Sequence, residues 1–191
     1  MLKPKRLCAG DTVAVISPCF ATPAERLPDI SKTIENLGLK ARFGKYVTAV
    51  TDGYCASAHE RAEDFNSAVK DKNIKMILFD GGEVCNELLP LIDYAAIEKN
   101  PKIICSYSDG TSLLDPITAK TGLVTYYGQG TLSTLYSQYN RDCFKSAFQI
   151  CDDIVDMLCS DGKTNGVLFD SLIQQFFLCQ LRMCRRCRMD H

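Results

Sequence analysis

The chain has 191 residues, a hydrophobic content of 46%, a charged content of 24% and a formal net charge of −1. This length supports one substantial core, and the near-zero net charge gives no electrostatic case for binding nucleic acid or a membrane surface. No apolar run reaches the roughly 20 residues that a membrane-spanning helix needs. The basic start at 1–6 is not followed by a long apolar segment. The pattern is therefore not that of a signal peptide, and we expect a cytoplasmic protein.

Strand and helix patterns alternate from residue 12 onwards. A β-branched apolar run at 12–17 predicts a buried strand, and a short second strand is expected at 40–44. Between these strands, a capping Thr22 is followed by proline and then by Glu25 three residues after the cap. This is a helix-start pattern, and Gly38 is expected to end the helix.

The next segment repeats the alternation. Ser57 and Glu60 form a capping box, and apolar residues follow at helical spacing, namely Ala62, Phe65 and Val69. The run 74–79 predicts a strand, and a helical stretch is expected through 88–94. A further strand is expected at 103–105.

After that strand we expect a helix toward Lys120, ended by Gly122, and then a strand at 123–127. Near-continuous apolar strands that alternate with helices predict an α/β fold. The sheet would be mostly parallel, with helices on both faces. In such sheets, functional sites form at the carboxyl ends of the strands.

The pattern changes beyond about residue 140. An amphipathic helix is predicted at 143–158, and four arginines lie in the seven residues 182–188. We interpret this ending as a solvated or disordered tail rather than as a contact for acidic partners. We therefore divide the chain into a first domain at 1–140 and an extension with a tail at 141–191.

Eleven cysteines are present, scattered among the predicted strands and helices. Without a secretory signal, buried thiols are a better interpretation than disulfides. Cys184 and Cys187 form one Cys-x-x-Cys pair near Cys179 and His191, but no second pair completes a zinc site. The sequence therefore predicts no metal and no cofactor.

Ser108 is the most informative position. It lies in the run Ser106-Tyr107-Ser108-Asp109-Gly110, between a predicted strand and a predicted helix. A nucleophile elbow needs this order, because the turn lifts a hydroxyl above the sheet edge and the next backbone N–H can face an oxyanion. The usual elbow is Gly-x-Ser-x-Gly, whereas this one has a single glycine. The residues alone leave two interpretations open, a nucleophile or a helix N-cap.

Several segments at 7–140, in order, resemble the LD-carboxypeptidase family, including its microcin-immunity branch. They are Gly10-Asp11-Thr12 followed by Ser17-Pro18, then Arg61 with Asp64 and Phe65, Gly81-Gly82 followed by Asn86-Glu87-Leu88-Leu89-Pro90, Asn100-Pro101-Lys102, Tyr107-Ser108-Asp109, and Thr121-Gly122-Leu123-Val124-Thr125-Tyr126 with Gly128. The resemblance implies that Ser108 is the nucleophile and that the backbone N–H groups of Asp109 and Gly82 bind the oxyanion. Gly81 and Gly82 would also contact the substrate.

Two positions depart from the family pattern. Ser106 stands where the family has glycine, and Gln129 stands where it has proline. Because Ser106 carries a Cβ, we expect slight strain in the tight backbone there.

The resemblance also implies an activity. The family comprises serine carboxypeptidases that cleave an amide next to a terminal carboxylate, in murein tetrapeptides or in peptidyl- or aminoacyl-nucleotide antibiotics. Its Ser-Glu-His triad takes the Glu and the His from a C-terminal domain, which we expect to be absent here. Neither His59 nor His191 lies where the family has its base. We therefore expect the chain alone to be inactive or nearly so.

Two alternatives remain. The chain could be a truncated, non-catalytic remnant that binds a ligand or partner. It could also be a nucleotide- or flavin-binding module, although it has no Gly-x-Gly-x-x-Gly or Walker loop. For a chain without the second domain, we expect exposed apolar surface around Ser108 and Gly82. Such a surface favours poor solubility or association, with a homodimer as one outcome.

Overall fold

The structure is a computed structural model that describes residues 1–149, except for 52, 81–84, 129 and 132–136. Several sequence predictions fall outside these described residues. They are Gly81 and Gly82, the departure at Gln129, the helix beyond 149, and the tail with Cys179, Cys184, Cys187 and His191.

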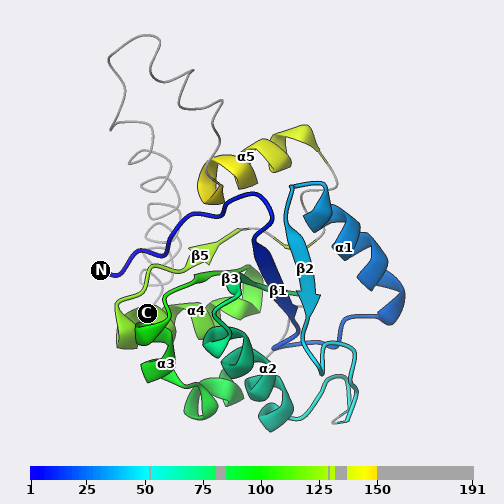
Figure 1. The fold of residues 1–191 in the computed structure, drawn as a ribbon. Coiled ribbons are helices and arrows are strands. Elements are labelled where there is room, and N and C mark those ends of the chain that lie inside the picture. Colours follow the sequence, from blue (N-terminus) through cyan, green and yellow to red (C-terminus); the bar gives the residue numbers. More distant parts are fainter. Residues whose placement is uncertain (52, 81–84, 129, 132–136, 150–191) are drawn as a thin grey trace, which may run out of the picture. The chain divides into compact units, whose positions relative to one another are not determined.

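Five parallel strands form one sheet in the order β2-β1-β3-β4-β5 (Figure 1). The strands are β1 (Thr12–Ile16), β2 (Lys40–Phe43), β3 (Ile74–Phe79), β4 (Ile103–Ser106) and β5 (Tyr126–Tyr127). The predicted α/β fold with a parallel sheet is therefore confirmed. The strand expected at 123–127 is shorter than predicted, because Leu123 forms an isolated bridge with Leu2. The strand order reverses between β1 and β3, and such switch points are where parallel sheets form ligand crevices.

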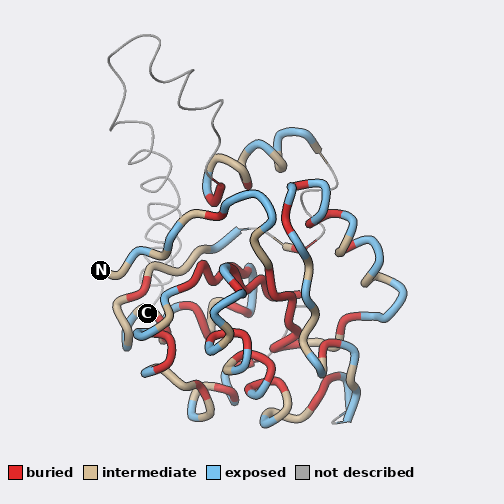
Figure 2. Tube along the Cα trace, viewed as in Figure 1, coloured by how far each residue is buried: buried red, intermediate tan, exposed pale blue. Residues whose placement is uncertain are grey.

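Helices cover both faces of the sheet, as predicted (Figure 1). They are η1 (Ala24–Arg26), α1 (Leu27–Glu35), α2 (Ala58–Lys70), η2 (Asn86–Leu91), α3 (Tyr94–Lys99), η3 (Ser108–Gly110), α4 (Thr111–Thr121) and α5 (Gln138–Phe148). Helices α2, α3 and α4 pack on one face and α1 and α5 on the other. Each face of the sheet has its own hydrophobic core. Alternate residues of each central strand pack into these two cores, with Leu78 in one and Phe79 in the other. The central strands are consequently buried along most of their length, apart from the partly buried Thr12 and the exposed Lys75 (Figure 2).

The start of α2 is the predicted capping box. The Ser57 hydroxyl accepts from the backbone N–H of Glu60, and the Glu60 carboxylate accepts from the backbone N–H of Ser57 at 2.9 Å. Helix α4 ends at Gly122, which has φ +69°, a left-handed conformation that suits glycine. Both helix boundaries therefore follow from local sequence signals.

The predicted cap at Thr22 is wrong. The residue before η1 is Pro23, and no side chain caps that helix. The Thr22 hydroxyl is buried and donates instead to the carboxylate of Asp80 at 2.7 Å. A buried carboxylate needs donors from the protein, whereas the exposed N–H groups of a helix end can bind water.

Helix α5 begins five residues before the predicted start at 143 and crosses the proposed division at 140. The Ser137 hydroxyl caps it by accepting from the backbone N–H of Asn140 at 3.1 Å. Phe144 and Phe148 pack in the same core as α1. The division of the chain at 140 stays a prediction.

Six cysteines lie among the described residues, and none of these six is joined in a disulfide. Four of them are buried as expected, namely Cys19, Cys55, Cys85 and Cys105, whereas Cys8 is exposed. In the described part of the chain, no helix has both the length and the apolar character that crossing a membrane requires.

Candidate active site

Ser108 lies at a sharp turn between β4 and a helix. Strand β4 ends at Ser106, Tyr107 is extended with φ −142° and ψ 170°, and Ser108 has φ +53°. No other non-glycine residue in the described part of the chain has a positive φ. A left-handed residue with a Cβ costs about 1–3 kcal/mol, so the surrounding structure must impose the conformation. Such strain is typical of functional turns.

The alternative interpretation of Ser108 as a helix cap is wrong. The cap of η3 is Tyr107 and the cap of α4 is Gly110, and neither helix has a side-chain capping bond. Ser108 is exposed, and among the described residues its hydroxyl has no hydrogen-bond partner. Its backbone carbonyl accepts from the Thr111 hydroxyl at 2.6 Å. The Ser108 hydroxyl is therefore exposed at the carboxyl edge of the sheet.

The glycine after the turn is required by packing. A Cβ on Gly110 would lie 1.9 Å from the Ser106 hydroxyl oxygen and 2.8 Å from the Ser106 Cβ. Ser106 is only 1% exposed, so its side chain has no free space to move into. The left-handed backbone lies at Ser108 rather than at Ser106, where we expected strain. Ser106 instead fills the space that makes Gly110 necessary.

Asp109, the predicted oxyanion donor, lies in η3, and two side chains contact its carbonyl oxygen. The Ser112 hydroxyl donates to this oxygen at 2.8 Å, and the Cys85 thiol lies 3.6 Å from it. The other predicted donor, Gly82, and its neighbour Gly81 lie outside the described residues. Their role at the oxyanion and at the substrate stays a prediction, as does that of the Asp109 backbone N–H.

A buried carboxylate that the sequence analysis missed lies at the same edge. Asp80, directly after β3, is 2% exposed and accepts from the hydroxyls of Thr22 and Thr131. Because the Thr22 proton goes to Asp80, the Ser17 hydroxyl is the donor in the 2.6 Å bond that joins it to Thr22. The Arg26 guanidinium lies 3.7 Å from the Asp80 carboxylate. Asp80 thus joins the loop after β1 to the segment after β5.

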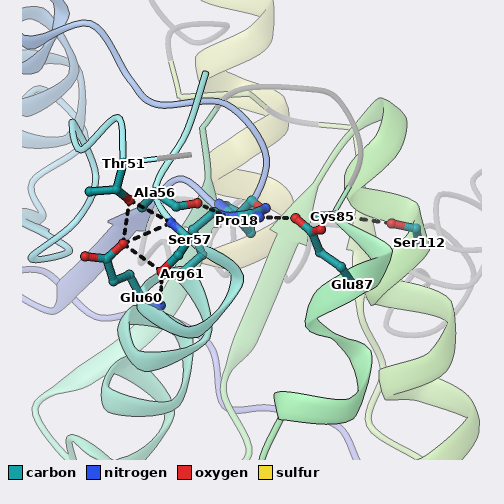
Figure 3. A network of polar contacts seen from close by, with 9 residues as sticks. All are labelled: Pro18, Thr51, Ala56, Ser57, Glu60, Arg61, Cys85, Glu87 and Ser112. Atoms are coloured by element: carbon teal, nitrogen blue, oxygen red, sulfur yellow. Dashed lines mark hydrogen bonds and ion pairs between the residues drawn. The ribbon is translucent and has the colours of Figure 1, made fainter. Parts of the chain in front are cut away.

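Arg61 joins further loops, and Figure 3 shows its contacts. It is 2% exposed, donates to the carbonyls of Pro18 at 2.6 Å and Ala56 at 2.7 Å, and forms an ion pair with Glu87. These three partners lie in different parts of the chain: Pro18 follows β1, Ala56 precedes α2, and Glu87 lies in η2. This network was also missed, because only the fold brings these residues together.

Asp64, one turn after Arg61, stabilises the turn that follows β2. Its carboxylate accepts from the backbone N–H groups of Lys45 and Tyr46, both at 2.8 Å. Burial raises the pKa of Asp64, and these two N–H groups oppose the shift. A Cβ on Gly44 would lie 2.4 Å from the Asp64 carboxylate, so the turn also needs glycine. Arg61 and Asp64, three residues apart on α2, thus hold several separate segments of the chain in place.

Cys85 lies between these networks and the turn at Ser108. It is buried, and its sulfur lies 3.2 Å from the Ser112 hydroxyl (Figure 3). Hydrogen bonding with Cys19 is the largest cause that lowers the pKa of the Cys85 thiol, followed by the contact with Ser112 and the charge of Arg61, and burial opposes the shift.

Neither histidine pairs with Ser108 in the described part of the chain. His59 is exposed in the first turn of α2, and no hydrogen bond joins it to Ser108. His191 lies outside the described residues. The described residues also include no cluster of three or more histidine, cysteine, aspartate or glutamate side chains that could hold a metal ion.

A strand, a serine at positive φ and a helix at the carboxyl edge of a parallel sheet have the geometry of a nucleophile elbow, as found in serine hydrolases. Residues 13–128 match a family model described as the LD-carboxypeptidase N-terminal domain. The chain therefore belongs to the LD-carboxypeptidase family, whose members are serine carboxypeptidases.

Individual relatives agree with this assignment. The microcin C7 self-immunity protein MccF of Escherichia coli is 42% identical over 127 residues, which are 64% of this chain and 37% of that protein. A solved MccF-like protein of Bacillus anthracis has a TM-score of 0.73 at 33% identity, over 78% of this chain and 47% of that chain. The muramoyltetrapeptide carboxypeptidase of Oxalobacter formigenes shares the fold, with a TM-score of 0.64 at 22% identity, over 71% and 47%.

The chain spans about half the length of the curated relatives it matches. MccF has been solved in complex with aspartyl sulfamoyl adenosine and with glutamyl sulfamoyl guanosine.

Proposed function

We propose that this chain is the nucleophile-bearing domain of an LD-carboxypeptidase. Ser108 would attack the carbonyl carbon of an amide next to a terminal carboxylate. The substrate would be a murein tetrapeptide or a peptidyl- or aminoacyl-nucleotide. The observation that carries the proposal is the left-handed Ser108, with its exposed hydroxyl, inside a segment that matches the family.

The reaction has two steps. In the first, the Ser108 oxygen bonds to the carbonyl carbon and its proton passes to a general base, while the backbone N–H groups of Asp109 and Gly82 stabilise the oxyanion. The C–N bond then breaks, the leaving amine takes a proton, and an acyl-serine remains. In the second, water attacks the acyl group and releases Ser108.

In the family's Ser-Glu-His triad, the general base comes from a C-terminal domain. The described part of this chain does not include that domain. Without its base, a positioned serine keeps only a small part of its rate enhancement, which comes from binding and from the oxyanion hole. We therefore propose that this chain alone turns over slowly or not at all.

The substrate class rests on the relatives. MccF binds aminoacyl sulfamoyl nucleosides, and the chain is 42% identical to MccF over its matched segment. The murein alternative follows from a probable murein peptide carboxypeptidase of Bacillus subtilis, to which the chain is 38% identical over 128 residues.

The test combines binding and release. The chain and its Ser108→Ala variant are each incubated with a murein tetrapeptide and with an aminoacyl-nucleotide, and the released amino acid is measured by mass spectrometry. Binding is measured in parallel by calorimetry. We expect both proteins to bind one of the two ligands, and any release to require Ser108. Equal release by both proteins would remove Ser108 as the nucleophile. Binding by both proteins without release would agree both with a nucleophile domain that lacks its general base and with a non-catalytic binding module, and fluorophosphonate labelling of Ser108 then separates the two.

A further inference from the structure

Cys85 lies close to the turn at Ser108, and the donor of each hydrogen bond among Cys85, Ser112 and Asp109 can be assigned. The Ser112 hydroxyl has a single proton, and that proton goes to the Asp109 carbonyl at 2.8 Å. In the 3.2 Å contact between Cys85 and Ser112, the thiol is therefore the donor, and it also lies 3.6 Å from the Asp109 carbonyl. One thiol proton thus bridges Ser112 and Asp109. The first turn after Ser108 is held by a side chain from a different part of the fold.

The segment that carries Cys85 is held from its other side by α2. Glu87, two residues after Cys85, pairs with Arg61, whose remaining donors bind the carbonyls of Pro18 and Ala56. Arg61 is 2% exposed, so its side chain is fixed by packing as well as by these bonds. Figure 3 shows the contacts running from Pro18 and Ala56 through Arg61 to Glu87, and from Cys85 to Ser112.

The elbow needs external contacts of this kind. Ser108 is in a left-handed conformation, and a residue with a Cβ keeps such a conformation only when its surroundings impose it. Within the turn itself, the Thr111 hydroxyl binds the Ser108 carbonyl and the Ser112 hydroxyl binds the Asp109 carbonyl. Both of these bonds are local. Cys85 adds a bond from residues 24 positions away in the sequence.

We propose that Cys85, held in place by the Arg61–Glu87 ion pair, is a positioning residue that fixes the Asp109 peptide and the left-handed Ser108. This rests on the proposed function, because Ser108 and Asp109 are given the roles of nucleophile and oxyanion donor. Cys85 does not touch the substrate in this account. Loss of its donor would let the turn relax toward negative φ and move the Asp109 N–H away from the oxyanion.

The experiment uses two readouts on the whole chain. The first is the rate at which a fluorophosphonate labels Ser108, and the second is amide hydrogen exchange of the peptide 107–114 relative to that of β1. The variants are Cys85→Ser, which keeps a donor, and Cys85→Ala, which removes it. Arg61→Lys and Arg61→Met form the second pair. Lys102→Met removes a buried cation at the opposite end of the sheet and serves as the control for general destabilisation.

We expect Cys85→Ser to label within about threefold of the parent, and Cys85→Ala to label more than about threefold and up to about tenfold more slowly, since a thiol is a weak donor and one hydrogen bond is worth at most about that factor. Exchange at 107–114 should rise in Cys85→Ala and Arg61→Met while exchange in β1 stays the same. Lys102→Met should leave the ratio of the two exchange rates unchanged.

Two results would overturn the proposal. One is Cys85→Ala with parental labelling and parental exchange at 107–114. The other is Lys102→Met with the same relative rise at 107–114 as Arg61→Met. If the fluorophosphonate labels neither the parent nor Ser108→Ala, the nucleophile proposal fails. Hydrogen exchange then still decides whether Cys85 positions the turn. If Arg61→Met does not fold, the two Cys85 variants carry the test.

Discussion

The two ends of the parallel sheet use buried polar groups in different ways. At the amino end, the Lys102 ammonium donates to the carbonyls of Asp71 and Ile74, both at 2.6 Å, and these partners lie just before β3 and at its first residue. At the carboxyl end, Asp80 and Arg61 connect loops that follow several different strands. Only the carboxyl end has a strained residue among the non-glycine residues that the structure describes, and that residue is Ser108.

This difference separates polar groups that complete the fold from those that hold a site. Lys102 donates to carbonyls at the start of β3, and the backbone there needs no unusual conformation. Asp80, Arg61 and Cys85 instead keep loops in place around a serine whose hydroxyl has no partner among the described residues. Strain and unused hydrogen-bonding capacity in one place are typical of functional sites.

The largest effect is expected at Asp80. Replacing Asp80 with Ala leaves the buried hydroxyls of Thr22 and Thr131 without their acceptor and removes the ion pair to Arg26. We expect a loss of about 2–4 kcal/mol in the free energy of unfolding, measured by urea denaturation. Asp80→Asn, which keeps an acceptor, is the matched control and should lose less. A loss below about 0.5 kcal/mol in Asp80→Ala would mean that the carboxyl end does not depend on this carboxylate.

The next effect is expected at Gly110. A Cβ there would meet the Ser106 side chain, so Gly110→Ala should cost about 1–3 kcal/mol and should slow fluorophosphonate labelling at Ser108. The double variant Ser106→Gly with Gly110→Ala makes room for the added methyl group and should recover most of both losses. The two changes are therefore expected to be strongly non-additive. Additive effects of the two substitutions would show that the contact between these positions does not shape the turn.

A smaller effect is expected at the amino end. Lys102→Met leaves two carbonyls without a donor but also removes a buried charge, so we expect a loss of about 1 kcal/mol in unfolding free energy. The labelling rate of Ser108 should not change. A Lys102→Met variant with normal stability but slow labelling would erase the distinction between the two ends.

The smallest effect is the pH dependence of that amino end. Burial, followed by the charge of Lys75, lowers the pKa of Lys102, with Asp71 opposing the shift. Between the lowered folded pKa and the unfolded value near 10.5, the unfolded chain binds more protons, so stability contributed through Lys102 rises with pH. The difference in unfolding free energy between the parent and Lys102→Met should therefore increase in the parent's favour up to about pH 10.5. A difference that stays constant with pH would contradict this account.

Local signals predicted the fold well and the site only in part. The capping box at Ser57, the left-handed end of α4 at Gly122 and the first four strands depend on neighbouring residues and lie where they were predicted, whereas the fifth strand is shorter than predicted. The cap predicted at Thr22 failed because a buried carboxylate 58 residues away takes its hydroxyl. Local rules fail where a distant group offers a stronger interaction.

For the site, the strand–serine–helix order was enough to select Ser108. It was not enough to choose between a nucleophile and a cap, because that choice depends on the φ angle and on the absence of a capping bond. The contacts of Asp80, Arg61 and Cys85 involve loops far apart in the sequence, so no spacing in the chain could indicate them. Only the packing of Ser106 against Gly110 explains why glycine is needed there.

The central claim is that Ser108 is a nucleophile held at the carboxyl end of the sheet. The most direct test is to treat the chain with a fluorophosphonate and to locate the adduct by peptide mass spectrometry, with Ser108→Ala as the control. We predict a single adduct on the peptide that contains Ser108, formed slowly because the general base is not among the described residues, and none in the variant. An adduct on another serine, or equal labelling of the variant, would contradict it.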